Sequence, residues 1–528
     1  MGADLVLENG HIVTLDDEMR EHQAIAMKNG RILELDTSKI PSLISDETKV
    51  IDLDGKTVLP GFIDAHQHMI QFGYKLLCVD CNLESISDVV SAIENKAKSA
   101  EPDEWIIGLG FNEANFKENR MLHREDFTHI ENPVMITRYC YHAAVVNQKA
   151  LIVSEINEST VNPEGGEIVK DNFNRLTGEL REKALDIVKA SIPPLTDREI
   201  EEAIFSANNF YLTQGITAVH EAGMGHLTGE LKEFRLFQKL SLNGSLDIRV
   251  YGMVLDQFFN EVADAKLVTG FGNQKLRLGS IKFFSDGTIS GQTASISENY
   301  SGSDSNRGMM MMPNSELKER IIAAHKEGFQ VAVHAIGDKA IELVLIAYEE
   351  ALELYPRKDH RHRIEHCGIV TPEIIKRMKK LHVIPVPQPA FIYLNGDVYM
   401  DVLPDKLKNL LYPAKTFIEE GLKPAGSSDC PVITSSVLLG ISSAMSRATR
   451  NGNIVSSSEQ VTLVEAIEMY TKNAAYAAFE ENEVGTIEIG KRGDLTILPP
   501  NFMTFSAEEV RETNVEMTVI EGDIKFTR

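Results

Sequence analysis

The sequence is poor in cysteine, poor in positive charge and free of long apolar runs. Its 528 residues include five cysteines, a sparse and odd set for this length: Cys78, Cys81, Cys140, Cys367 and Cys430. Secreted folds that depend on disulfides use many more, so we expect a reducing compartment and no disulfides. The C-x-x-C spacing of the first two does not change this, because a zinc knuckle needs a second such pair.

Basic residues are scarce relative to acidic ones. The chain has 53 Lys and Arg against 78 Asp and Glu, a formal net charge of −25. Nucleic acids and anionic membranes attract clustered Lys and Arg, so neither is an expected partner. No stretch approaches the ~18 consecutive apolar residues of a membrane span, and no signal-peptide pattern opens the chain. We therefore expect a cytoplasmic protein, with a homodimer as the commonest assembly of soluble proteins.

Short alternating segments occur at both ends of the chain. In residues 1–58 they flank Asn9-Gly10, Asn29-Gly30 and Asp54-Gly55, and each of these steps predicts a two-residue β-hairpin. Residues 485–528 have the same texture. We predict that the two ends meet in one β-sandwich.

Residues 59–484 contain strands that alternate with helical stretches, which is typical of parallel βα units. After a first strand near residue 62, the candidate strands are 133–140, 216–221, 248–254, 278–286, 330–335, 363–366, 382–387 and 424–429. The interval before residue 214 is too long for one crossover, so we assign 133–140 to an insertion of roughly 75–195. The predicted fold is α/β: a (β/α)8 TIM barrel with an insertion after its first strand and a terminal β-sandwich.

The first barrel strand runs into the motif His66-x-His68. Strand side chains alternate between faces, so His66 and His68 point the same way. Two imidazoles at a strand end suit a borderline cation such as zinc. For this motif alone, a pair of surface or capping histidines is an equally good interpretation.

Four later strands also carry groups able to bind a metal at or near their ends. Lys282 lies inside an apolar strand, His334 and His366 end two others, and Asp429 ends the last. A lone buried histidine is usually a core residue, but the C-terminal strand ends of a barrel converge on the face where active sites are built. Strand alternation predicts that Glu365, next to His366, faces the other way.

The position of Lys282 allows more than one interpretation. A buried lysine is costly unless it is paired or chemically altered. The alternatives are that Lys282 extends to solvent or pairs with Asp286.

One ordered set of residues resembles the metal site of the amidohydrolase superfamily: His66, His68, Lys282, His334, His366 and Asp429. The segments around them, 59–68, 333–340, 362–367 and 426–432, are similar to those of the amidohydrolase-3 branch that includes N-substituted formamide deformylase. The resemblance covers nearly the whole chain. It implies a metal-bearing barrel with a flanking β-sandwich.

The resemblance also implies a role for each residue. The four histidines would be ligands of a divalent metal, with zinc the expected ion and one or two ions per chain. At the position of Lys282, many relatives carry a carboxylated lysine that bridges two metals. In other relatives this position is not a bridge and the site holds one metal. Asp429 would be the proton shuttle and a further ligand. His142, in the segment 141–147, would bind substrate or stabilise an oxyanion.

The resemblance implies a hydrolase of a non-peptide C–N bond in a small-molecule amide, N-substituted formamide or cyclic amide, and the chemistry of these residues fits that reaction. A bound metal lowers the pKa of its water to about 7 and polarises a carbonyl. Asp429 would accept the water proton and pass it to the leaving amine. The alternatives are an aminohydrolase that deaminates a heterocycle and a catalytically silent relative.

Overall fold

The computed structural model describes residues 2–528, and these divide into two compact units. One unit holds the chain up to Phe72 together with Ile204–Arg528, and the other holds Gly73–Ala203. No helix within residues 2–528 has the length and apolar character needed to cross a bilayer. The domain limits given above, 1–58 with 485–528 and 59–484, stay a prediction.

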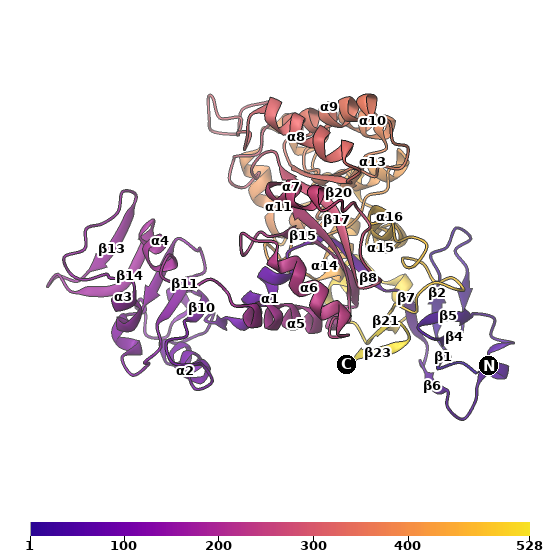
Figure 1. Cartoon of the computed structure of the whole chain (residues 1–528), viewed down its shortest axis with the longest axis horizontal. Helices are drawn as coiled ribbons and strands as arrows, with labels where there is room; N and C mark the ends of the chain where they lie inside the picture. The colour runs from indigo at the N-terminus through magenta and orange to yellow at the C-terminus, as the bar shows by residue number, and fades with distance from the viewer. Residues whose placement is uncertain (1) are drawn as a thin grey trace. The chain divides into compact units, whose positions relative to one another are not determined.

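A curved parallel sheet forms the centre of the first unit (Figure 1). Within the described chain it has seven strands, paired in this order: β8 (Phe62–Gln67), β15 (Ile216–Met224), β16 (Arg249–Leu255), β17 (Leu276–Phe284), β18 (Val331–Ala335), β19 (Arg363–His366) and β20 (Ile384–Val386). Every residue of β8, β15 and β16 is buried, as expected of parallel strands covered on both faces. The result is a nearly closed parallel barrel in a mixed α/β protein.

The eighth barrel strand, predicted at 424–429, is not formed as a ladder. The segment is extended and lies between the two edges of the sheet: Ala425 N donates to Pro385 O at 3.0 Å, and Ala65 N donates to Gly426 O at 3.1 Å. Further along, Ser428 N donates to a side chain, Asp64 Oδ1, at 3.0 Å. The regular ladder fails because Asp429 has a left-handed backbone, with φ 60°, and a carboxylate takes the place of a carbonyl acceptor.

Helices follow the strands and cover the sheet (Figure 1). α10 shows how local sequence sets one of them: Thr371 caps its start by accepting from Ile374 N, Pro372 occupies its first position, and His382 ends it with φ 52°. The helices of this unit are α6 (Lys232–Leu242), α7 (Phe259–Asp264), α8 (Asn314–Lys326), α9 (Asp338–Leu354), α10 (Pro372–Leu381), α11 (Ala390–Val402), α12 (Asp405–Lys408), α13 (Ala414–Glu419), α14 (Val437–Ser446), α15 (Leu463–Met469), α16 (Lys472–Ala477) and α17 (Ala507–Glu512).

The N- and C-terminal segments share a sheet. Its order is β23 (Asp523–Thr527), β22 (Met517–Ile520), β21 (Leu495–Pro500), β7 (Lys56–Pro60), β2 (His11–Val13) and β3 (Glu21–His22). A second sheet has the order β5 (Arg31–Glu34), β4 (Ile25–Lys28), β1 (Leu5–Glu8) and β6 (Lys49–Asp52). Apolar side chains of both sheets form one buried cluster, and the indigo and yellow strands lie together in Figure 1.

Of the three predicted hairpins, only the one at Asn29-Gly30 is formed: it joins β4 to β5, with φ 50° and 74° at its two turn residues. The other two predictions were wrong. Asn9-Gly10 and Asp54-Gly55 each carry the chain from one sheet to the other, and Gly55 N donates to Asn9 O at 2.7 Å. The backbone geometry of such a step fixes a tight turn, but distant strands decide which neighbours pair.

The second unit has its own sheet, in the order β13 (Gly166–Lys170), β14 (Leu176–Glu182), β12 (Ala143–Val146), β11 (Val134–Arg138), β10 (Ile106–Phe111) and β9 (Val79–Asp80). Its helices are α2 (Ile86–Ala97), α3 (Gln148–Val153) and α4 (Ala184–Lys189). The candidate strand at 133–140 is β11, which pairs with β10 and β12. The unit boundaries fall inside α1 (Met69–Leu77) and α5 (Asp197–Thr213).

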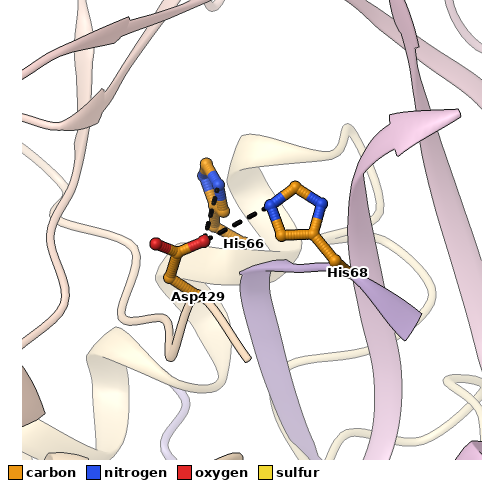
Figure 2. Close-up of side chains that lie close together, drawn as sticks. All are labelled: His66, His68 and Asp429. Atoms are coloured by element: carbon orange, nitrogen blue, oxygen red, sulfur yellow. Dashed lines mark ion pairs between the residues drawn. The ribbon is translucent and has the colours of Figure 1, made fainter. Parts of the chain in front are cut away.

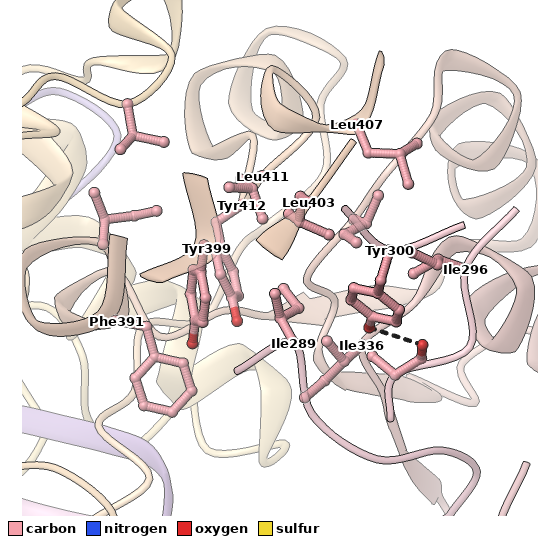
Figure 3. Close-up of a cluster of buried hydrophobic side chains, with 14 residues drawn as sticks. Ile289, Ile296, Tyr300, Ile336, Phe391, Tyr399, Leu403, Leu407, Leu411 and Tyr412 are labelled. Atoms are coloured by element: carbon pink, nitrogen blue, oxygen red, sulfur yellow. Dashed lines mark hydrogen bonds between the residues drawn. The ribbon is translucent and has the colours of Figure 1, made fainter. Parts of the chain in front are cut away.

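The loops at the C-terminal ends of the barrel strands pack into an apolar cluster (Figure 3). It joins Ile289 after β17, Ile336 after β18 and Phe391 after β20 to Tyr300, whose hydroxyl donates to Ala294 O at 2.9 Å. These loops therefore hold the last residues of the strands in place.

A buried trio of histidines lies near the opposite end of the same strands. His325 Nδ1 is 2.9 Å from His362 Nε2, and His360 Nδ1 accepts from His362 N at 2.9 Å. Arg357 Nη2 is 2.8 Å from His325 Nδ1, and the Tyr348 ring packs on His362. Burial lowers the pKa of each of the three histidines, and that of His360 falls to about 4.

This trio predicts a loss of stability in mild acid. The unfolded chain takes up these protons near pH ~6.5, but the folded state resists them, so the stabilisation is complete above that pH and is lost as the pH falls toward about 4. The trio should therefore lower the urea midpoint at pH ~5 relative to pH ~7.5, against the opposite contribution of buried carboxyls such as Asp64 and Glu221, whose pKa values are raised by burial to about 7. His360→Gln, which keeps an acceptor and a donor, should reduce the difference; an unchanged pH dependence would contradict the prediction.

Candidate metal centre

Two histidines from the end of β8 meet the aspartate that follows the extended segment 424–428 (Figure 2). His66 Nε2 lies 3.5 Å and His68 Nε2 lies 3.4 Å from Asp429 Oδ1. One nitrogen from each histidine and one carboxylate oxygen all lie within 4.8 Å of one another. Two imidazole nitrogens and a carboxylate are a donor set that suits a divalent metal such as zinc.

The other ligands predicted in the barrel lie beside these three. The ring centroid of His366 is 4.9 Å from that of His66, and the His334 ring is 4.4 Å from that of His366. Lys282 Nζ lies 3.5 Å from His66 Nε2. The cluster is therefore continuous from His68 to His334, and it lies at the C-terminal ends of β8, β17, β18 and β19.

Lys282 neither extends to solvent nor pairs with Asp286. Its side chain is fully buried, so it does not extend to solvent. Asp286 is occupied elsewhere, because its carboxylate accepts from Ser295 N, Ile336 N and Gly337 N at 2.9–3.0 Å. Burial lowers the pKa of Lys282 to about 8.

His142 belongs to the other compact unit, Gly73–Ala203. It begins the turn into β12, is exposed, and its Nδ1 lies 3.1 Å from Glu182 Oε2. Its role toward substrate stays a prediction.

Two residues of the site have left-handed backbones. His366 has φ 67° and Asp429 has φ 60°, and Cys367 follows with φ 50°. Such angles cost a residue with a side chain about 1–3 kcal/mol and gather at functional sites. Tertiary contacts hold them: Cys367 N donates to Ala335 O at 3.2 Å, and Asp429 N donates to His66 O at 2.7 Å.

The expectation for Glu365 was wrong. Its Oε2 lies 2.5 Å from His66 Nδ1 and its Oε1 accepts from Arg363 Nε at 2.7 Å, so it faces the site. Strand alternation fails here because His366 leaves the strand conformation, and two consecutive side chains then turn toward the barrel interior.

Burial sets the charge states of the cluster. It lowers the pKa of His66 and His334 well below the usual histidine range, and it lowers that of His366. Neutral imidazoles keep a nitrogen lone pair for a cation. Burial raises the pKa of Asp429, but its interactions with His68, His66 and His366 outweigh burial and hold that pKa well below its usual range.

Sequence reasoning missed several residues of this site. His226 follows β15, and its ring centroid is 5.8 Å from that of His68. Glu221 ends the candidate strand at 216–221, and its Oε1 lies 3.8 Å from His68 Nδ1. Glu221 ends the predicted strand and His226 lies just beyond the end of β15, the same signal that identified the other ligands. Gln388, which faces His366 Nδ1 at 2.8 Å, lies just beyond the end of β20 and carries the same signal.

Comparison with known proteins agrees with the family resemblance of the sequence. The model of the amidohydrolase family matches residues 49–526. The amidohydrolase YtcJ of Bacillus subtilis (strain 168) is 30% identical over 491 residues, 92% of each chain. The N-substituted formamide deformylase of Arthrobacter pascens is 28% identical over 99% of this chain and 98% of its own. An uncharacterized metal-dependent hydrolase from Pyrococcus furiosus superposes with a TM-score of 0.78, at 28% identity over 94% of this chain and 99% of its own. The chain belongs to the amidohydrolase family, in its amidohydrolase-3 branch.

Proposed function

We propose that this hydrolase of the amidohydrolase superfamily cleaves a non-peptide C–N bond of a small amide, N-substituted formamide or cyclic amide, with water. The observation that carries the proposal is the group of His66, His68 and Asp429 at the C-terminal end of the barrel. The similarity to a formamide deformylase along nearly the whole chain supports the amide as substrate class.

The donor set fits a divalent cation, with zinc as the proposed ion. His66, His68, His334 and His366 would hold one or two ions, and Asp429 would be a further ligand. When bound, the metal lowers the pKa of a coordinated water to about 7 and polarises a carbonyl. Lys282 is buried beside His66, with its pKa lowered to about 8, so its neutral amine would be available for carboxylation, and the resulting carbamate would supply the oxygens that bridge two ions.

Asp429 supplies the proton transfers. Its Oδ1 lies within 3.5 Å of both His66 and His68, so it would lie beside a water held at this donor set. The carboxylate accepts the water proton and delivers it to the nitrogen of the leaving amine. His142 would bind the substrate or stabilise the oxyanion.

Deamination of a heterocycle remains the alternative. A deaminase would need a carboxylate near His366 to recognise the base. Glu365 is the neighbouring carboxylate, and its two oxygens are already engaged by Arg363 and His66. Amide hydrolysis is therefore the better-supported proposal.

The decisive experiment measures metal per chain by mass spectrometry, on protein purified without chelator, together with amine release from a panel of N-substituted amides. We expect one or two ions per chain and release of a primary amine. Two ions would support a carboxylated Lys282, and one would leave this lysine unmodified. His66→Ala should lose metal, whereas the control His11→Ala, in the terminal sheet, should keep it. No metal even after reconstitution, or metal without amine release, would overturn the proposal.

A further inference from the structure

A charged pair lies buried behind the metal-facing side of the site. Arg363 Nε donates to Glu365 Oε1 at 2.7 Å and Arg363 Nη2 donates to Oε2 at 3.0 Å, a two-pronged contact. Both side chains are fully buried. Removing charges from water is costly, so a pair in this place calls for a role beyond stability.

Glu365 reaches from this pair to His66. Its Oε2 lies 2.5 Å from His66 Nδ1, on the side of the ring away from Asp429. A carboxylate can only accept here, so Nδ1 carries the proton. A neutral imidazole has one such proton, and Nε2 therefore presents its lone pair toward Lys282 and Asp429.

Arg363 fixes where that carboxylate lies. Its Nη2 also donates to Ala65 O at 2.6 Å, which ties the guanidinium to the backbone of β8 next to His66 itself. Its Nη1 lies 2.9 Å from His220 Nδ1 on β15. The pair thus connects β19 to β8 and β15, and Glu365 cannot turn away from His66 without breaking these contacts.

We propose that Glu365, held by Arg363, is the positioning residue that sets the tautomer and orientation of His66 for metal binding. His68 has no equivalent partner: its Nδ1 is buried without a hydrogen bond in the described chain, and Glu221 is 3.8 Å away. The inference rests on the proposed metal-dependent function. In this role Glu365 points toward His66, whereas strand alternation predicted that it faces away from the site.

The test is the apparent zinc affinity of the full chain, measured by competition with a chromophoric chelator. Glu365→Gln keeps the shape but loses the charge that holds the Nδ1 proton, and loss of such an outer partner weakens metal binding about 10–100-fold. Glu365→Asp keeps the charge and withdraws the oxygen from His66, so it should also weaken binding; it replaces the first variant if that one fails to fold.

The matched control is Asp494→Asn. Asp494 also pairs with a buried arginine, Arg249, at 2.8 Å, but at the other end of β16. It should lower the urea midpoint and leave zinc affinity unchanged, which separates positioning from general stability. Wild-type affinity in either folded Glu365 variant would overturn this inference alone. Failure of the wild-type chain to bind zinc would overturn the proposed function instead.

Discussion

Asp429→Asn is expected to lower kcat for amide hydrolysis by about 10²–10⁴-fold, the usual contribution of a positioned general acid–base. The amide cannot accept the proton of an attacking water, nor return it to the leaving nitrogen. It keeps the size of the carboxylate, and the backbone bond from Asp429 N to His66 O does not involve the side chain. The fold should therefore survive.

Rates should be measured on a substrate from the amide panel, with metal content determined on the same samples. The control is Asp405→Asn, an exposed carboxylate at the start of α12 that should leave kcat unchanged. Retained metal with lost turnover supports a proton shuttle, whereas joint loss of both assigns Asp429 to metal binding. An Asp429→Asn kcat within threefold of the wild-type value would contradict both roles. A tenfold change in rate corresponds to about 1.4 kcal/mol of activation free energy, so a threefold change is small on this scale.

Arg363→Met is expected to destabilise the chain by about 3–5 kcal/mol, because it leaves Glu365 charged and uncompensated in the interior. Arg363 donates to Glu365, Ala65 O and His220, and it is fully buried. Its removal leaves these acceptors without their donor. The shift of the urea midpoint measures the effect.

A double variant tests the cause of that loss. Arg363→Met with Glu365→Leu removes both charges and fills the space with apolar groups, a change that is often neutral in buried pairs. It should recover most of the stability that the single variant loses, although zinc affinity should stay low. A double variant as unstable as the single one would show that packing, and not the unpaired charge, causes the loss.

The order of the barrel strands and most of the candidate site could be predicted from the sequence. Short segments rich in apolar residues mark β15, β17 and β18, and parallel strands that carry His66, Lys282 and His334 at or near their ends must converge at one end of a barrel. That inference needs only the period of a strand and the topology of the fold.

The predictions that were wrong depended on contacts between residues that are distant in the sequence. The positive φ of His366 and Asp429 has no local signal such as glycine, because the bonds to Ala335 O and His66 O come from other strands. The prediction of the side-chain direction of Glu365 was wrong because of the positive φ of His366. The step Asn9-Gly10 likewise defines a turn, whereas its long-range partners decide that β1 and β2 enter different sheets.

Because the eighth strand forms no regular ladder, the barrel wall has one junction with few backbone hydrogen bonds, here called the seam. The segment 424–430 bonds to β8 through Gly426 O, Asp429 N and Cys430 O, but its backbone meets β20 at Ala425 N. Within the described chain, the seam therefore runs between this segment and β20. Asp429 is bonded to the same backbone that carries His66 and His68, so an opening of the seam, which must also break the Ser427 Oγ bonds to Pro387 and Gln388, would leave these three side chains together.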